Sequence, residues 1–364
     1  MAEQLYDAIV VGAGMAGLVI AHGLAVYGWK VLLLEKKQFP RSKVCGGCLN
    51  PRGVAVLSRL MGDDLPYAFP LKDAYVQRLG SKRTLRIPLR PPYQFVDRWE
   101  FDEALLQRVR SKGVEIREGV AVVDTTLEGE QRSLEYLEGE AKESKTVLGR
   151  VVIGCEGLAG ILPKREGVLV ETSPTYWRTK LGFSLEAVGD VAPEFRMICA
   201  PWGYLGMVAH EQGIHLAAAT TPEAIRSVGI PTLVEKTLHA AGLSKVNPDW
   251  NTLQATPQLS RRLNRVSGER ILFAGDSAGY VEPITGEGMT WALLSAESAL
   301  ESLREGWGNH TAADYQRRWE HSVGRKQRWA SFLCALADRR ILQASAWNLL
   351  STSSHARHWV GKTG

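Results

Sequence analysis

The sequence has few cysteines and no long apolar segment, and both absences exclude classes of protein. No uncharged apolar run reaches the roughly 18 residues that a membrane-spanning helix requires. The five cysteines are an odd number, which argues against a disulfide framework and for a reducing compartment. Residues 1–7 are mostly polar and lead directly into an apolar segment, so we expect no signal peptide. These features predict a soluble, cytoplasmic protein.

Concentrated charge is also absent. The net charge of +5, from 44 Lys and Arg against 39 Asp and Glu, is spread along the chain. No basic tract is interleaved with aromatic residues, so we expect no nucleic-acid partner. The nearest approach to such a tract, Arg261 and Arg262 with Arg265 and Arg270, is expected in a solvated loop. With 45% hydrophobic and 23% charged residues, the chain is globular and is long enough for two domains, or for one domain with an insertion.

What the sequence does contain is a glycine-rich turn near its start. Residues 8–35 indicate an apolar strand, this turn, an amphipathic helix and a second apolar strand. The turn carries Gly12, Gly14 and Gly17 in the spacing G-x-G-x-x-G, which is a weak motif alone but a strong one in this order of elements. Gly12 permits the tight turn, Gly14 lets the backbone approach a diphosphate, and Gly17 lets the helix pack on the strand.

An acidic residue, Glu35, ends the second strand of this unit. Its carboxylate is placed to bind a pair of ribose hydroxyls and would repel a 2′-phosphate. The free N–H groups at the start of the helix favour a diphosphate. The segment therefore predicts a site for FAD or NAD but not for NADP, and both of the first two remain open at this point.

A second glycine-rich segment lies near the other end of the chain. An apolar strand at residues 271–274 is followed by Gly275 and Asp276, and Gly286-x-Gly288 then opens a long helix. Asp276 is suited to bind a polyol hydroxyl, and the glycines let backbone approach a ring. The positive end of the helix would stabilise the negative charge of a reduced flavin. Because NAD has no ribityl chain and needs no such second site, this segment favours FAD.

These motifs resemble the FAD-binding signatures of the group A flavoprotein monooxygenase superfamily, which includes geranylgeranyl reductases and flavin-dependent halogenases. The resemblance is carried by residues 12–17, 98–102, 154–157 and 275–289 and covers most of the chain. It implies an α/β protein in which a Rossmann-like FAD-binding domain holds an inserted antiparallel-sheet substrate domain and is followed by C-terminal helices. It also implies FAD as cofactor and NADH or NADPH as electron donor.

The domains implied by this resemblance are discontinuous. The FAD-binding domain is expected at residues 1–75, 96–160 and 265–320. The substrate domain is expected at 76–95 and 161–264, where several runs alternate with the period of β-strands. The tail at 321–364 is apolar and helical in pattern. We expect it to dock on the FAD-binding domain; the alternative is a substrate-entrance lid or a helix in peripheral contact with a membrane surface.

The resemblance also implies which residues bind the cofactor. Arg98 would reach the diphosphate, Val120 and Val122 would lie beside the adenine, and residues 283–289 would lie along the isoalloxazine ring. The family's usual Gly-Ala-Asp-Gly is here Gly154-Cys155-Glu156-Gly157, and the longer glutamate bears on the NAD(P)H step. The expected cofactor-binding residues are Gly12, Gly14, Ala16, Gly17, Glu35, Lys36, Arg41, Cys45, Gly46, Gly47, Arg98, Val120, Val122, Glu156, Gly157, Gly275, Asp276, Pro283, Gly286, Gly288 and Met289.

The segment Cys45-Gly46-Gly47-Cys48 has three interpretations. A zinc site needs about four ligands, and the other cysteines are scattered, so we expect no metal. A redox dithiol needs its cysteines at a helix start beside a strand, whereas this segment follows a linker. In the superfamily the corresponding segment curls over the flavin, and geranylgeranyl reductases carry a similar Cys-Gly-Gly. We therefore expect Cys45 at the flavin or substrate face and Cys48 as a small buried residue.

Three reactions follow from the resemblance. We favour an NAD(P)H-dependent monooxygenase of secondary metabolism, which hydroxylates a hydrophobic aromatic or polyketide-like small molecule through a flavin C4a-hydroperoxide. The alternative is saturation of C=C bonds in a lipophilic substrate, as in geranylgeranyl reductases, although their Tyr-x-Trp-x-Phe-Pro motif is replaced by residues 204–209. The Trp-x-Trp-x-Ile-Pro motif of halogenases is absent, and an FAD-binding protein without catalysis is the remaining reading. The candidate catalytic residues are Cys45, Pro283 and Tyr204.

Overall fold

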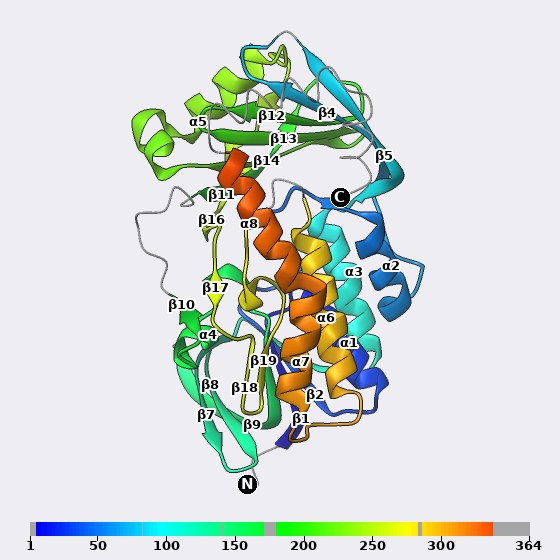
Figure 1. The fold of residues 1–364 in the computed structure, drawn as a ribbon, viewed down its shortest axis with the longest axis vertical. Coiled ribbons are helices and arrows are strands. Elements are labelled where there is room, and N and C mark those ends of the chain that lie inside the picture. The colour runs from blue at the N-terminus through cyan, green and yellow to red at the C-terminus, as the bar shows by residue number, and fades with distance from the viewer. Residues whose placement is uncertain (1–4, 82, 140, 171–179, 283–285, 338–364) are drawn as a thin grey trace.

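The fold is built on two sheets, one mostly parallel and one mostly antiparallel, that lie end to end along the long axis of the molecule (Figure 1). This structure is a computed structural model, and it describes residues 5–81, 83–139, 141–170, 180–282 and 286–337. The expected α/β class, with a Rossmann-like domain, a second antiparallel sheet and helices after both, is confirmed.

The first sheet has the strand order β18-β19-β9-β1-β2-β6. β1 (Leu5–Val11) lies between β2 (Val31–Glu35) and β9 (Glu143–Gly154) and is parallel to both. β2 and β19 are buried along their whole length, as is typical of strands with helices or strands packed on both faces. The remaining strands are β6 (Glu115–Glu118), β18 (Ser267–Gly268) and β19 (Ile271–Phe273), and a meander adds β7 (Ala121–Glu128) and β8 (Gln131–Glu138).

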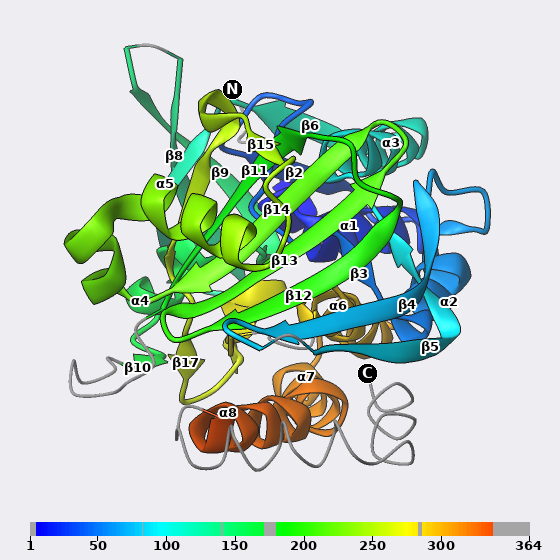
Figure 2. The same cartoon turned by 90° about the horizontal axis from the view of Figure 1, so that it is seen from above.

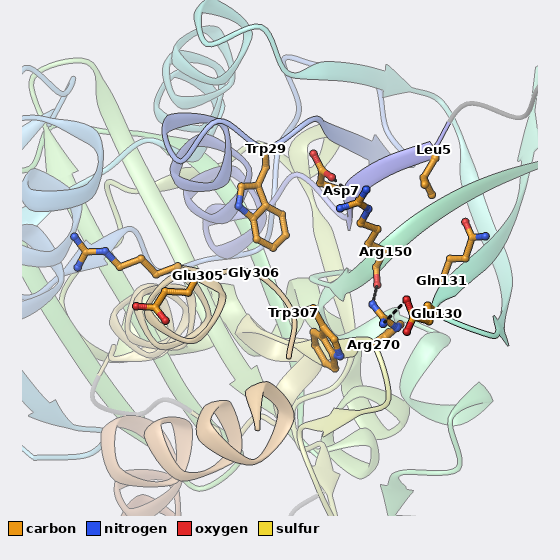
Figure 3. A pocket seen from close by; sticks show the side chains of 11 residues that line it. Leu5, Asp7, Trp29, Glu130, Gln131, Arg150, Arg270, Glu305, Gly306 and Trp307 are labelled. Carbon is orange, nitrogen blue, oxygen red and sulfur yellow. Dashed lines mark hydrogen bonds and ion pairs between the residues drawn. The ribbon is translucent and has the colours of Figure 1, made fainter. Parts of the chain in front are cut away.

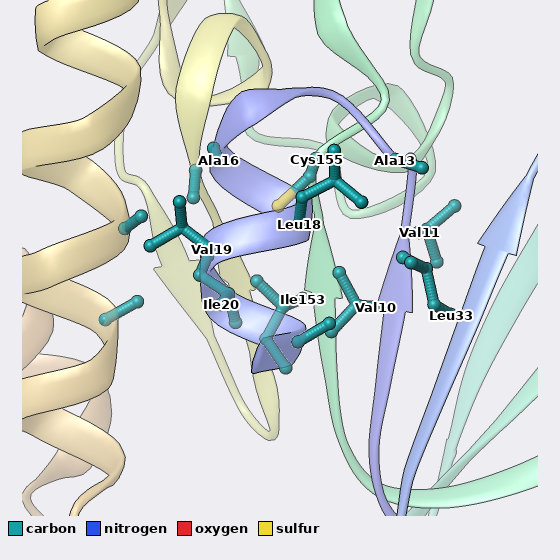
Figure 4. Close-up of a cluster of buried hydrophobic side chains, with 14 of the residues drawn as sticks. Val10, Val11, Ala13, Ala16, Leu18, Val19, Ile20, Leu33, Ile153 and Cys155 are labelled. Carbon is teal, nitrogen blue, oxygen red and sulfur yellow. The ribbon is translucent and has the colours of Figure 1, made fainter. Parts of the chain in front are cut away.

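The helix that follows β1 is the most deeply buried helix of this domain. In α1 (Met15–Val26), every residue from Met15 to Leu24 is buried. It packs against both α3 (Arg98–Ser111) and α6 (Gly288–Leu303), and Figure 4 draws its side chains beside those of the sheet. The expectation of an amphipathic helix was therefore wrong, because two helices cover the face that would otherwise meet solvent.

The second sheet has the order β15-β11-β14-β13-β12-β4-β5-β3. Its pairs are antiparallel except that β12 runs parallel to β4. α5 (Pro222–Ala240) covers its outer face, with Val234 and Leu238 packed on the strands (Figure 2). The strands are β3 (Cys48–Leu49), β4 (Phe69–Arg78), β5 (Thr84–Phe95), β11 (Leu181–Val188), β12 (Glu194–Ala200), β13 (Gly203–His210), β14 (Gly213–Thr220), β15 (Asn247–Pro248) and β16 (Gln254–Gln258).

The predicted domain boundaries stay a prediction, and the strands bear on them at one place. β4 already starts at Phe69, ahead of the substrate-domain start expected at residue 76. The short strand β3 adds Cys48 and Leu49 to the same sheet by pairing with the end of β5. The chain therefore passes between the two sheets more than once, and the segment around Cys45 is one of these crossings.

The last described helices lie along the first domain. α7 (Thr311–Trp319) docks on the parallel sheet, where the buried Tyr315 hydroxyl donates to the Phe273 carbonyl at 2.5 Å. A π-turn leads into α8 (Arg325–Ala337), which points toward the second sheet in Figure 1. The rest of the expected tail, from residue 338, lies outside the described residues. Within the described ranges, none of the helices has both the length and the apolar character of a membrane span.

Candidate functional site

The glycine-rich turn leaves β1 at its carboxyl end and allows no side chain at two of its glycines. Gly12 has φ +102°, and a Cβ there would lie 2.4 Å from the Cys155 carbonyl oxygen. A Cβ on Gly17 would lie 1.9 Å from the Gly12 carbonyl oxygen. Both distances are far below van der Waals contact. The turn can therefore form only with glycine at these positions, which confirms the expected tight turn and close helix packing.

Gly14, between them, borders open space instead. A Cβ there would have the Lys43 Nζ, at 3.9 Å, as its nearest neighbour. Gly14 is also the N-cap of α1, no side chain caps this helix, and no acidic residue occupies its first turn. The free N–H groups of a helix start need acceptors, and an anion that approaches the bare Gly14 backbone would supply them. The turn thus fits a diphosphate.

The carboxyl end of β2 carries the acidic residue of the site. Glu35 is 8% exposed and accepts hydrogen bonds from the Ala13 and Lys37 N–H groups at 2.7 and 2.9 Å. Its own carbonyl accepts from the Val120 N–H at 3.0 Å, so Val120 lies buried beside it. Lys36 is exposed, and Val122 is half-buried in β7. Glu35 thus contacts the turn through the Ala13 N–H, and Val120 lies beside Glu35.

A buried cluster of charges joins α3 to this turn. Asp102 is fully buried and accepts from the Arg98 Nε at 2.8 Å, from the Arg98 Nη2 at 2.7 Å and from the Arg41 Nη1 at 3.2 Å. Arg41 also donates to the Ala13 carbonyl at 2.8 Å. Burial lowers the pKa of Arg98, but the Asp102 carboxylate and the Cys45 side chain together outweigh burial and raise that pKa. The cluster holds two cations beside the turn that fits a diphosphate.

Asp102 was not among the predicted site residues. Its signal in the sequence was present but weak: Arg98 and Asp102 are four residues apart, a spacing that brings two side chains together on a helix. The spacing does not reveal that the pair is buried or that Arg41, from a loop far away in the chain, completes it.

The second glycine-rich segment lies against the first. A Cβ on Gly275 would be 3.1 Å from the Ala16 Cβ, so η3 (Gly275–Ala278) touches the start of α1. The Asp276 carboxylate lies 3.3 Å from the Lys43 Nζ, and Lys43 is also the nearest neighbour of Gly14. Asp276 and Glu35, from opposite ends of the chain, therefore border one continuous site.

The Cys45–Cys48 loop lies at the edge of this site toward the second sheet. Gly47 has φ +68°, and a Cβ there would lie 2.3 Å from the Phe95 ring, so this position also requires glycine. A Cβ on Gly46, in contrast, would have no neighbour within 4 Å. Cys45 is partly exposed, and Cys48 is buried; both are free thiols, and burial raises the pKa of Cys48. Cys48 thus has the buried packing role that was expected.

The segment Gly154-Cys155-Glu156-Gly157 makes its hydrogen bonds with other parts of the protein. Glu156 accepts from the Ile161 and Leu162 N–H groups at 3.1 and 3.2 Å, and burial raises its pKa despite these bonds. The Gly157 carbonyl accepts from Arg261 at 3.0 Å. The Glu156 side chain therefore caps its own loop, and its contact with a cofactor stays a prediction.

Arg261 was expected in a solvated loop, and that expectation was wrong. It is 7% exposed and donates to the carbonyls of Gly157, Leu158 and Gly160. Its backbone pairs with Tyr280, in the segment that follows η3. Arg261 thus links the loop at Gly157–Gly160 to the segment that follows η3. No local sequence pattern indicated this role.

Of the remaining predicted residues, Tyr204 belongs to the second sheet. Tyr204 is 8% exposed in β13 and packs with Leu259, against which Met197 and Tyr280 also lie. A buried ion pair joins Lys180 to Glu282 at 3.0 Å. Gly286 precedes α6, whose first two residues are Gly288 and the buried Met289. Pro283 lies outside the described residues.

A surface cavity of about 830 Å³ lies elsewhere. Figure 3 shows Leu5, Trp29, Arg150 and Trp307 among its lining residues. Leu5 starts β1, so this cavity is at the amino edge of the parallel sheet, whereas ligands of such sheets bind at the carboxyl edge. This rule favours, as the place for a ligand, the glycine-rich cradle formed by Gly12, Gly14, Gly17, Lys43 and Asp276. Among the described residues, no three His, Cys, Asp or Glu side chains gather as metal ligands.

Comparisons with a family model, with curated sequences and with solved structures find an FAD-binding family, a reductase and monooxygenases. A family model described as "FAD binding domain" matches residues 5–305. Digeranylgeranylglycerophospholipid reductase 1 of Methanopyrus kandleri is 28% identical, over 86% of each chain. Rifampicin monooxygenase of Streptomyces venezuelae is 25% identical, over 88% of this chain and 69% of its own. The crystal structure of p-nitrophenol 4-monooxygenase from Pseudomonas putida superposes with a TM-score of 0.79 at 16% identity, covering 100% of this chain and 94% of that one.

Proposed function

The chain belongs to the FAD binding domain family and is an FAD-dependent oxidoreductase, and from this premise we propose that it is an NAD(P)H-dependent monooxygenase. Its proposed substrate is a hydrophobic aromatic or polyketide-like small molecule. The observation that carries the cofactor assignment is the single cradle in which Gly14, the uncapped start of α1, Lys43 and Asp276 meet.

Each part of the cradle has a proposed role toward FAD. The N–H groups at Gly14 and the start of α1 bind the diphosphate, and Arg98 and Arg41 balance its charge from the buried side. Glu35 binds the ribose hydroxyls of the adenosine half, and Asp276 binds the ribityl hydroxyls. When bound, FAD supplies the redox chemistry, and the protein orients substrate and excludes water. We assign that last role to the apolar cluster of Tyr204 and Leu259.

Two observations favour hydroxylation. Rifampicin monooxygenase and p-nitrophenol 4-monooxygenase are similar to this chain in sequence and in fold, respectively. The chain also lacks the Trp and the Phe-Pro of the substrate-sheet motif that geranylgeranyl reductases carry, because residues 204–209, in β13, are Tyr-Leu-Gly-Met-Val-Ala. Because oxygen chemistry belongs to the cofactor, no protein nucleophile is needed, and the second sheet has only to shape an apolar site.

The second candidate is reduction of C=C bonds in a lipophilic substrate. It is favoured by the similarity to digeranylgeranylglycerophospholipid reductase 1 and by Cys45-Gly46-Gly47, whose loop borders the cradle. In this reading the partly exposed Cys45 thiol is the candidate acid that protonates the substrate carbon, and Tyr204 is its alternative.

One experiment separates the two candidates. The FAD-loaded protein is reduced anaerobically with NADH or NADPH and is then mixed with ¹⁸O₂ and a panel of phenols and polyketide aromatics. Monooxygenation predicts one ¹⁸O atom in a product and substrate-dependent NAD(P)H oxidation. If no substrate gains ¹⁸O while a polyprenyl olefin reoxidises the reduced protein without oxygen, the hydroxylase proposal fails and the reductase replaces it.

A further inference from the structure

A histidine of the second sheet bridges to the Cys45 loop of the cradle. His215, in β14, has its Nε2 2.6 Å from the Cys45 carbonyl oxygen and its Nδ1 2.8 Å from the Glu186 Oε1. Glu186 lies directly across from it in the paired strand β11. The His215 side chain is 16% exposed and that of Glu186 is 57% exposed, so the bond to the Cys45 carbonyl is better shielded from water than the bond to Glu186.

The two partners fix the protonation state of this histidine. A carbonyl oxygen and a carboxylate oxygen only accept hydrogen bonds, and a neutral imidazole has only one N–H to donate. His215 can make both bonds only when both of its nitrogens carry protons, that is, as an imidazolium. Burial lowers the pKa of His215, but the hydrogen bond and charge of Glu186, the Cys45 carbonyl and the Asp97 carboxylate together outweigh burial and raise that pKa above its ordinary value.

Three other groups bear on the charge of His215: the Asp97 carboxylate, the Cys45 carbonyl and His210. The Asp97 carboxylate, ahead of α3, and the Cys45 carbonyl also favour the imidazolium. A charged His210, at the end of β13, would disfavour the His215 imidazolium. Burial lowers the pKa of His210 and so favours its neutral form. The Phe95 ring also lies close, with its centroid 6.0 Å from that of His215.

The bridge reaches the cofactor cradle through the loop it holds. The Cys45 thiol lies beside the Arg98 guanidinium, and Arg98 continues through Asp102 and Arg41 to the Ala13 carbonyl. We propose that the His215 imidazolium is a positioning residue, which holds the Cys45 carbonyl and so keeps the Cys45–Cys48 loop against bound FAD. This role rests on the proposed function, because it assigns the loop to the FAD site.

The direction of its pH dependence follows from the sign of the pKa shift. A histidine whose pKa is raised in the folded protein contributes its bond fully below about pH 6.5, the ordinary value for imidazole. The contribution is lost as the pH rises through the higher pKa of His215 in the fold. FAD should therefore be held most tightly at mildly acidic pH and more weakly above neutrality.

The charge of His215 is tested first, without activity. In the full-length protein labelled with ¹⁵N-histidine, the His215 resonances are assigned by their loss in His215→Gln and are followed between pH 5 and 9. We expect both nitrogens to be protonated at pH 7, with a midpoint above about 6.5 that falls in Glu186→Gln. A His215 that is neutral at pH 7, or a midpoint unchanged by Glu186→Gln, would overturn the proposal.

The positioning role is tested by FAD affinity over the same pH range. In the unchanged protein the dissociation constant should rise by about tenfold as His215 deprotonates, since a hydrogen bond from a charged donor is lost. His215→Gln keeps a donor that does not titrate, so it should flatten this profile, whereas the neighbouring control His210→Gln should keep it. An unflattened profile in His215→Gln refutes the role. If the unchanged protein binds no FAD, the proposed function fails, while the NMR result still stands.

Discussion

Replacement of Asp102 by asparagine is the sharpest test of the buried charge cluster. Asp102 is fully buried and accepts three hydrogen bonds from Arg98 and Arg41 at 2.7–3.2 Å. Removal of one partner of a buried ion cluster leaves the other charges uncompensated and costs about 3–5 kcal/mol. The asparagine amide has nearly the same shape, so the loss is electrostatic and leaves no cavity. We therefore expect Asp102→Asn to destabilise the FAD-free protein by about that amount.

The assay is urea-induced unfolding of the FAD-free protein. When the variant and the unchanged protein have the same m-value, the difference between their urea midpoints reports the difference in stability. Glu100→Gln is the matched control, because Glu100 is exposed on the same helix and its loss should barely move the midpoint. FAD should recover part of the lost stability in Asp102→Asn, since a diphosphate brings negative charge to the two arginines. If Asp102→Asn unfolds at the same urea concentration as the unchanged protein, the charges of Arg98 and Arg41 do not need the Asp102 carboxylate for stability, and the reasoning is refuted.

Substitutions at three further positions separate residues that the fold of the cradle requires from residues that bind FAD. Gly17→Ala places a Cβ 1.9 Å from the Gly12 carbonyl oxygen, so circular dichroism should show a large loss of thermal stability; an unchanged melting curve would contradict the close packing. Gly14→Val meets only the Lys43 Nζ, so it should keep the melting temperature of the FAD-free protein but weaken FAD binding more than about tenfold in fluorescence titrations; equal affinity would remove Gly14 from the site. Asp276→Ala should weaken FAD binding about tenfold by equilibrium dialysis. A smaller loss of affinity in Asp276→Asn would support hydrogen bonding of Asp276 to a hydroxyl group, whereas no loss in either variant would exclude this role.

The parts of the site that could be predicted from the sequence are those set by local chemistry. Glycine spacing, continuous apolar strands and an acid at a strand end are visible within some thirty residues, so the turn at Gly12 and the position of Glu35 follow directly. Asp276 is far away in the chain, but both acids follow parallel strands. Since the carboxyl ends of parallel strands share one edge of a sheet, the two were expected to meet.

The parts that could not be predicted depend on contacts between distant segments. Arg261 belongs to a basic cluster that resembles an exposed loop, and only the fold supplies the three carbonyls that bury it. His215 is one of several scattered histidines, and its role depends on a loop 170 residues earlier in the chain. The same holds for α1, whose two covering helices come from later segments. When the partners of a side chain come from distant parts of the chain, the local sequence pattern does not reveal its contacts.

The attachments of the Cys45–Cys48 loop differ in chemistry, and this limits how far a change of pH can act. At Cys48 the loop is held by backbone pairing with Phe95 and by the Val96 N–H bond to the Gly47 carbonyl at 2.8 Å, and neither group titrates near neutral pH. At Cys45 the attachment to the second sheet is His215, which does titrate. Deprotonation removes the positive charge of His215 and one of its two hydrogen bonds, so it should loosen one end of the loop while the other stays fixed. A graded loss of FAD affinity follows from this asymmetry, whereas an unfolding transition over the same pH range would mean that His215 supports the whole junction between the sheets.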